Sequence, residues 1–172
     1  MNTTIVGIGD SNWEFGGHGW AYGFSEKVTQ KTLVFYPGGS SRDVLRRIKK
    51  MSITEKEVPK GSIVVINLGI NDVLQGIHPY ETAANHAKIR RVIKKRVGSR
   101  QFVWMPSHWT GDLEVEVARW WIYQTAKKYK DVKFINLFRW AGRTVWNNPH
   151  DPYHLSKGSY RILARKALNK IL

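Results

Sequence analysis

The segment "TTIVGIGDSN" (residues 3–12) begins as an apolar, β-branched run and ends in a turn that contains glycine and serine. Such a run is typical of a strand that is covered on both faces of a sheet. The turn can simply connect this strand to the next helix. It can also hold the Ser11 hydroxyl at the carboxyl end of the strand, open to a substrate, and the rest of the sequence has to decide between these two interpretations.

Short apolar runs alternate with longer stretches of helical period along the chain. Strands are predicted for "TTIVGIG" (3–9), "TLVFY" (32–36), "SIVVINLG" (62–69), "QFVWM" (101–105) and "VKFINL" (132–137). Helices are predicted over residues 40–51, 81–97, 114–129 and 156–172. This alternation favours a parallel sheet with helices on both faces. We therefore expect an α/β protein with a flavodoxin-like three-layer α/β/α sandwich and a five-stranded parallel sheet, in which residues 1–172 form a single domain.

The composition combines a globular apolar content with a large excess of positive charge. Lys and Arg number 28 against 13 Asp and Glu, which gives a formal net charge of +15. The excess is concentrated in "RRIKK" (46–50), "KIRRVIKKRVGSR" (88–100) and "KKYKDVK" (127–133). Basic runs are usually solvated helix faces, but these contain few acidic residues. They favour contact with a polyanion such as nucleic acid, an acidic polysaccharide or an anionic membrane surface.

Other features of the sequence limit its class and its location. No apolar run approaches the ~18 residues of a membrane-spanning helix, so no membrane span is expected. The N-terminal residues lack a basic segment followed by an apolar core, and no secretory signal is predicted. There is no cysteine, which excludes disulfides and thiolate chemistry. The cytoplasm fits these features, although they do not require it.

Polar groups follow the predicted strands at the edge where doubly wound sheets bind their ligands. These groups are Ser11 after the first strand, Gly38 and Gly39 after the second, Asn71 after the third, Ser107 and His108 after the fourth, and Asp151 and His154 after the fifth. A hydroxyl, glycine backbone, a side-chain amide and an Asp/His pair are thus expected on one edge of the sheet.

These groups are the ones that nucleophilic catalysis by serine requires. Ser11 is a weak nucleophile without a base, and His154 can remove its proton. Asp151, three residues earlier, can orient the His154 ring and stabilise the imidazolium. The backbone N–H groups of Ser11 and Gly39, with the Asn71 amide, can stabilise an oxyanion.

Four blocks of the sequence resemble those of the SGNH (GDSL-type) hydrolases. They are "GDSN" (9–12), "GGSS" (38–41), "GIND" (69–72) and "DPYH" (151–154), in the order of the family. The resemblance extends from residue 7 to the last helix, and it implies a flavodoxin-like fold that cleaves esters and related acyl bonds. It implies a catalytic triad of Ser11, Asp151 and His154, an oxyanion hole of Ser11, Gly39 and Asn71, and no cofactor.

The sequence departs from the family pattern at two places. Asn12 stands where the family usually has leucine, which we expect to change the packing of the turn rather than the chemistry. The second block matches least well, so Gly38 stays open as an alternative donor to Gly39. A metal site is not expected, because no H-E-x-x-H or H-x-x-x-H pair occurs.

Tryptophan is abundant, with eight residues in the chain. Trp104, Trp120 and Trp121 fall in predicted strands or helices, where core or half-buried packing is the simplest interpretation. Trp13, His108 and Trp109 flank the predicted site and are candidate substrate contacts, because aromatic side chains can stack on sugar rings or hold an acyl chain.

The sequence therefore predicts a serine esterase that removes small acyl groups, for example acetyl groups, from a carbohydrate or an envelope polymer that could be acidic. Hydrolysis of lipids or thioesters is consistent with the same resemblance. The rival class is a basic, non-catalytic binding module for nucleic acid or an assembly partner. Loss of esterase activity in Ser11→Ala would favour the enzyme, and salt-dependent DNA binding that ignores this change would favour the rival.

Overall fold

The computed structural model describes residues 3–14, 19–106, 108, 110, 112–137, 147–148 and 151–172. The strands are β1 (Thr4–Gly9), β2 (Thr29–Phe35), β3 (Ile63–Asn67), β4 (Gln101–Trp104), β5 (Val132–Phe134), β6 (Asn147–Asn148) and β7 (Asp151–Leu155). The helices are α1 (Trp20–Ser25), α2 (Ser41–Lys50), α3 (Ile70–Leu74), α4 (Pro79–Val97), α5 (Leu113–Ala126) and α7 (Lys157–Ile171). None of these helices is both long and apolar enough to cross a membrane.

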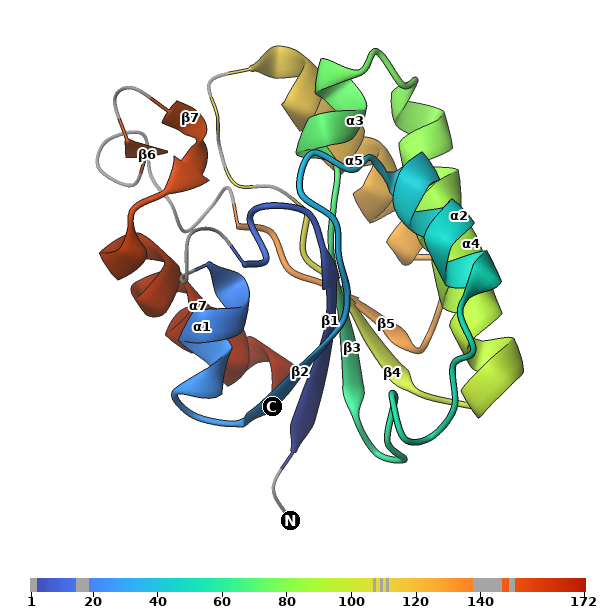
Figure 1. Ribbon diagram of the computed structural model, residues 1–172. Helices are drawn as coiled ribbons and strands as arrows, with labels where there is room; N and C mark the ends of the chain where they lie inside the picture. Colours follow the sequence, from blue (N-terminus) through green and yellow to red (C-terminus); the bar gives the residue numbers. More distant parts are fainter. Residues whose placement is uncertain are drawn as a thin grey trace.

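Strands β1 to β5 form one parallel sheet in the order β2-β1-β3-β4-β5 (Figure 1). This is the flavodoxin-like order, in which the sheet grows to both sides of the first strand. The predicted fold class and the five-stranded parallel sheet are therefore confirmed. Ile5 pairs with Ile63 and Gly9 with Asn67, so the two central strands end at the same level and their carboxyl-terminal turns lie side by side.

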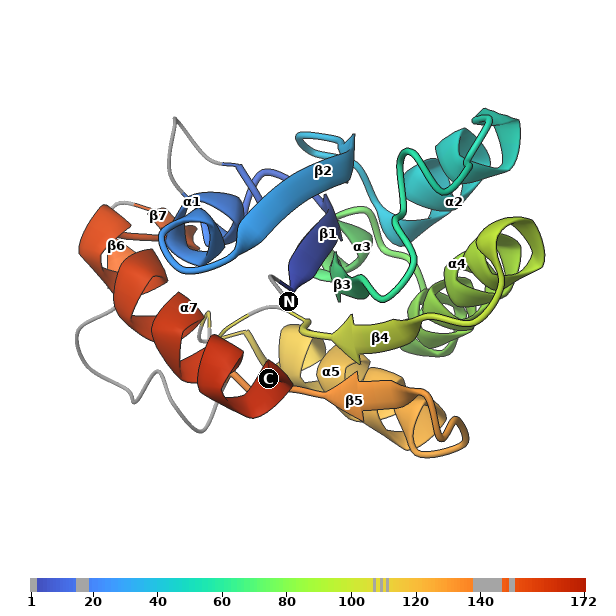
Figure 2. The same cartoon turned by 90° about the horizontal axis from the view of Figure 1, so that it is seen from below.

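Helices cover both faces of the sheet, with α1 and α7 on one side and α2, α4 and α5 on the other (Figure 2). Side chains of a strand alternate between its two faces. In β1, Val6 and Ile8 therefore pack with α2 and α4, whereas Ile5 packs with α1 and α7. Every residue of β3 is buried, which explains its continuous apolar run.

Several elements differ from those that the sequence predicts. The short helices α1 and α3, of six and five residues, were not expected, because so few residues cannot display a helical period. Strand β2 begins at Thr29 rather than at residue 32, and its first residues are polar because it lies at the edge of the sheet. The "DPYH" segment, for which no strand was predicted, lies in β7, which pairs antiparallel with β6.

The first two basic runs lie on neighbouring helices of one outer layer, α2 and α4 (Figure 1). Their exposed cations include Arg46, Lys49 and Lys50 on α2, and Lys88, Arg91 and Lys95 on α4. These helices leave their basic residues in water because their opposite faces pack on the sheet.

Candidate active site

Ser11 lies in the turn at the end of the central strand β1. The turn is closed by the Trp13 N–H, which donates to the Asp10 carbonyl at 3.0 Å. The Asn12 N–H donates to Asp10 Oδ1 at 2.9 Å. These bonds hold Ser11 at the carboxyl end of β1, and its side chain is half-buried rather than enclosed.

The three residues of the predicted triad lie in one hydrogen-bonded chain. Ser11 Oγ is 2.8 Å from His154 Nε2, and His154 Nδ1 is 2.6 Å from Asp151 Oδ2. Because an ionised carboxylate can only accept, Nδ1 carries the proton and Nε2 accepts from the Ser11 hydroxyl. The structure thus brings Ser11 and His154 together across 143 residues of sequence.

Strand β7 presents the Asp/His pair through its own backbone. Asp151 Oδ1 accepts from the N–H groups of Tyr153 and His154, at 3.1 Å and 3.2 Å. The other carboxylate oxygen, Oδ2, is left for the His154 ring. One carboxylate therefore orders both the backbone and the imidazole, which explains why the two residues are spaced three apart.

Asn71 connects the first two sequence blocks. It lies in the first turn of α3, and its Nδ2 is 3.2 Å from Asp10 Oδ2 and 3.3 Å from the Gly39 carbonyl oxygen. Asp10 itself is 2% exposed. Burial raises the pKa of Asp10 to about 6, although hydrogen bonds from Asn12 oppose the rise. At neutral pH Asp10 is thus mostly an ionised acceptor that orients Asn71, a role that the sequence analysis did not assign although Asp10 is part of "GDSN".

Gly39 does not offer its N–H to the site. That group donates to the Tyr36 carbonyl at 2.9 Å and closes the turn Tyr36-Pro37-Gly38-Gly39. Pro37 at the second position and Gly38 at the third, with φ of 69°, are the signature of a type II turn. The structure therefore corrects the assignment of Gly39 as an oxyanion donor. The Asn71 amide and the Ser11 N–H remain as candidate donors.

Asp72 fixes the helix that carries Asn71. Its fully buried carboxylate accepts from the Ser41 N–H at 2.8 Å, from the Ser41 hydroxyl, and from Thr82 Oγ1 at 3.0 Å. These contacts join α3 to α2 and α4. Asp72 thus fixes the position of α3, the helix that carries Asn71.

Asn12, the departure from the family pattern, is buried and bonded to α7. The Tyr160 hydroxyl donates to Asn12 Oδ1 and accepts from the Leu155 N–H at 3.3 Å. Asn12 follows Ser11, and Leu155 follows His154, so Tyr160 links the neighbours of Ser11 and His154. A leucine at position 12 could not accept this bond.

Tyr160→Phe is therefore expected to lower kcat about tenfold and to leave KM nearly unchanged, since only the alignment of Ser11 with His154 is altered. Kinetics with p-nitrophenyl acetate and the melting temperature would be measured together, with the exposed Tyr22→Phe as control. A fall in the melting temperature with an unchanged kcat would show that the hydroxyl is only structural.

The candidate substrate contacts are not borne out where the structure describes them. Trp13 is fully buried, donates from Nε1 to Thr32 Oγ1 at 3.0 Å, and packs against Phe24 with ring centroids 5.8 Å apart. The prediction that Trp13 contacts the substrate is thus wrong, because this side chain belongs to the core. His108 is 1% exposed and offers a substrate no surface either. Trp109 lies outside the described residues.

Metal ligands do not gather at this site. In the described segments, no three His, Asp or Glu side chains lie close enough together to hold a metal ion. The chemistry available from the described residues is that of a hydroxyl, an imidazole, a carboxylate and amide donors.

Comparisons with known proteins identify the fold. No protein-family model matches the sequence, and no curated protein matches it. A solved member of the lipolytic protein G-D-S-L family from Veillonella parvula is 18% identical, with a TM-score of 0.72, and 97% of each chain is covered. AlinE4, described as an SGNH-hydrolase family esterase, is 19% identical, with a TM-score of 0.62, 100% of this chain covered and 97% of the other.

A third solved structure is longer than this chain. It is the salicylyl-acyltransferase SsfX3 of a tetracycline biosynthetic pathway, which is 15% identical with a TM-score of 0.72. The match covers 99% of this chain but only 54% of that one, so this chain spans about half of its length. The likeness to all three structures extends over nearly the whole chain, and the chain has the fold of the SGNH (GDSL-type) hydrolases.

Proposed function

We propose that this protein is a serine ester hydrolase that acts through Ser11, His154 and Asp151. The observation that carries the proposal is the hydrogen-bonded chain from Ser11 Oγ to His154 and on to Asp151, at 2.8 Å and 2.6 Å. Both distances are within the range in which a base can take a proton from a nucleophile. The fold shared with esterases supports the same reaction class by analogy.

The proposed reaction has two steps, and His154 moves the proton in each of them. Ser11 Oγ attacks the ester carbonyl while His154 Nε2 takes its proton, and Asp151 stabilises the imidazolium. His154 then gives the proton to the leaving alcohol, which departs as the C–O bond breaks. A water molecule, deprotonated by the same imidazole, attacks the acyl-enzyme, and the acid is released with Ser11 restored.

The oxyanion of the tetrahedral intermediate would be stabilised by the Ser11 N–H and the Asn71 amide. The two hydrogen bonds that Asn71 makes to Asp10 and Gly39 are long, at 3.2 Å and 3.3 Å. An oxyanion carries more charge than the Gly39 carbonyl and competes well for one of these amide protons. The Asp10 bond meanwhile keeps the amide directed at the site.

The favoured substrates are small acyl esters on an extended carrier, such as acetyl groups on a polysaccharide. The proposed triad supports this choice because it is not enclosed, with the His154 side chain 19% exposed and that of Asp151 30% exposed. The basic helices α2 and α4 favour a carrier with acidic groups. Lipid and thioester substrates are alternatives that use the same chemistry.

A fluorophosphonate probe tests the mechanism directly, because it phosphonylates only an activated serine. We expect one covalent adduct on the peptide that contains Ser11, no adduct in Ser11→Ala, and strongly slowed labelling in His154→Ala. Heat-denatured protein is the control for background reactivity. Labelling of another serine, such as the exposed Ser25, or equal labelling after denaturation, would contradict the proposal.

The rival function is a basic binding module, favoured by the neighbouring basic helices α2 and α4. If the protein is such a module, we expect no phosphonylation of Ser11. We also expect DNA binding that weakens steeply with salt and is equally strong in the parent and in Ser11→Ala.

A further inference from the structure

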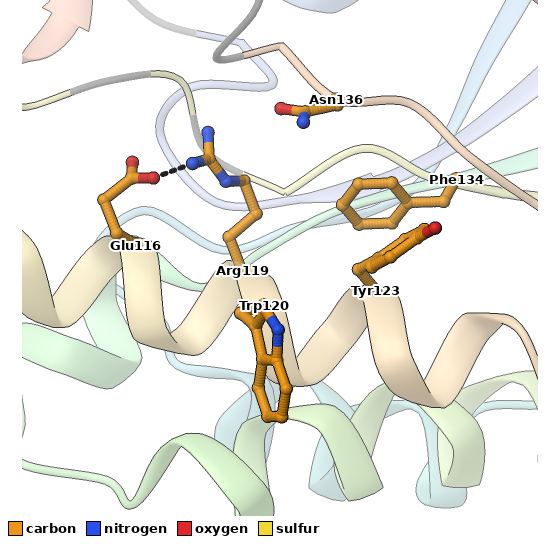
Figure 3. A pocket seen from close by; sticks show the side chains of 6 residues that line it. All are labelled: Glu116, Arg119, Trp120, Tyr123, Phe134 and Asn136. Atoms are coloured by element: carbon orange, nitrogen blue, oxygen red, sulfur yellow. Dashed lines mark ion pairs between the residues drawn. The ribbon is translucent and has the colours of Figure 1, made fainter.

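A hollow outside the triad lies between α5 and the end of β5 (Figure 3). Its volume is about 460 Å³. The described residues that line it are Glu116, Arg119, Trp120, Tyr123, Phe134 and Asn136. In Figure 3 the side chains of Arg119, Tyr123, Phe134 and Asn136 border one space, and Trp120 lies at its outer edge on the helix.

The polar wall of this pocket is a buried ion pair. The Arg119 side chain forms an ion pair with Glu116 one turn earlier, and Arg119 as a residue is 8% exposed. Burial lowers the pKa of Arg119 to about 10, which leaves it charged at neutral pH. The Glu116 carboxylate beside Arg119 offsets its positive charge and disfavours an anionic ligand.

One oxygen of this pair still lacks a hydrogen bond. Glu116 Oε1 is buried, and none of the described residues donates to it. A buried acceptor without a donor is costly, and proteins rarely leave one unless a ligand or water completes it. Because a carboxylate oxygen can only accept, the missing group is a donor such as a hydroxyl.

The other wall of the pocket is aromatic and open to solvent. The Tyr123 and Phe134 rings lie 5.1 Å apart at an angle of 57°, and Tyr123 is 41% exposed. Trp120, for which core or half-buried packing was expected, is 53% exposed. Exposed aromatic surface beside a buried polar pair is typical of a binding site rather than of a solvated helix face.

A sugar ring satisfies both walls at once. Its hydroxyls can donate to Glu116 Oε1 and accept from the Arg119 guanidinium and the Asn136 amide. Its C–H face can pack against Tyr123. An anionic ligand would meet the Glu116 carboxylate instead. We propose that the pocket between α5 and β5 is a carbohydrate-binding subsite that takes an uncharged sugar ring.

The helix α5, which carries this subsite, packs beside α3, which carries Asn71. A Cβ placed on Gly69 would lie 3.7 Å from Ile122 Cδ1, so the two helices touch there. Ile122 follows Arg119 by three residues, and Asn71 follows Gly69 by two. A glycan held by α5 would therefore lie beside the helix of the oxyanion donor. This consequence rests on the proposed function, whereas sugar binding itself does not.

The test is a direct binding measurement with unesterified oligosaccharides, which requires no catalysis. Isothermal titration calorimetry would use the neutral hexamers of cellulose, xylan and chitin, with oligogalacturonate as the acidic comparison. We expect at least one neutral oligosaccharide to bind, and we expect Tyr123→Ala and Glu116→Gln each to weaken it about tenfold. Leu113→Ala, a change of an exposed apolar residue on the same helix but outside the pocket, should bind as the parent does.

The outcomes separate the subsite from the proposed function. Absence of neutral oligosaccharide binding, or binding that is equal in all variants, would overturn the subsite even if the protein hydrolyses esters. Binding that Tyr123→Ala weakens, in a protein without phosphonylation at Ser11, would support the subsite and overturn the esterase. If Glu116→Gln fails to fold, Tyr123→Ala decides, because its half-exposed ring is not required for the core. Sedimentation that shows a dimer lost in Leu113→Ala would make this face a self-association surface and overturn the proposal.

Discussion

Ser11→Ala is expected to lower the rate of p-nitrophenyl acetate hydrolysis by about four to six orders of magnitude, down to background. The loss is this large because the change removes the atom that attacks the carbonyl. His154→Ala should cost a similar factor, since the Ser11 hydroxyl at 2.8 Å then has no base. Steady-state rates of the purified variants, beside melting curves, would measure both effects.

The combination of the two changes tests whether Ser11 and His154 act as one unit. If they do, the double variant is no slower than either single variant, because the second change removes something that no longer functions. Ser25→Ala, an exposed serine on α1, is the matched control and should keep the parent rate. Equal rates in the parent and in Ser11→Ala, with unchanged melting temperatures, would contradict the proposed mechanism for this ester.

The candidate site could be predicted because a parallel sheet determines where its strands end. Once the strands at 3–9 and 62–69 are recognised, Ser11 and Asn71 must arrive at the same edge. In the structure Gly9 pairs with Asn67, which places both turns at one level. The spacing of Asp151 and His154 was also readable, because an Asx-type turn needs only local sequence.

The donors of the oxyanion hole were less predictable, because they depend on which way each peptide group points. The "GGSS" block gives the residue types but not their hydrogen bonds. Pro37 and Gly38 form a type II turn that uses the Gly39 N–H internally, at 2.9 Å from the Tyr36 carbonyl. A larger residue would not fit at position 39 of the same block, because a Cβ there would lie 2.3 Å from the Tyr36 ring.

Two of the tryptophans were assigned in the wrong sense for a related reason, whereas Trp104 is buried as expected. Trp13 was expected at the site because it follows the turn that carries Ser11, and Trp120 was expected to be core or half-buried because it lies in a helix. Burial is decided by neighbours that the sequence did not reveal. The six-residue helix α1 covers Trp13. Trp120 instead lies on the solvent-exposed face of α5.

Gly7→Ala is expected to destabilise the protein by about 3 kcal/mol and to lower its melting temperature by about 6–12 °C. A Cβ at position 7 would lie 1.7 Å from Trp13 Cζ2 and 1.9 Å from Cε2, so the indole would have to move. Trp13 is fully buried and cannot move without displacing Phe24 or breaking its bond to Thr32. Thermal unfolding followed by circular dichroism would measure the change.

The same substitution tests why Trp13 is where it is. Gly158→Ala is the control, because nothing lies within 4 Å of a Cβ at that helical position and alanine favours the helix. If Gly7 exists to admit the indole, Trp13→Phe in the Gly7→Ala background should cost less than in the parent, because the smaller ring relieves the clash. If the destabilisations by Gly7→Ala and Trp13→Phe simply add, residues 7 and 13 are not in the contact that the structure shows. Because Trp13 is two residues from Ser11, we also expect esterase activity to fall with the displaced indole, and to recover in part with the double variant.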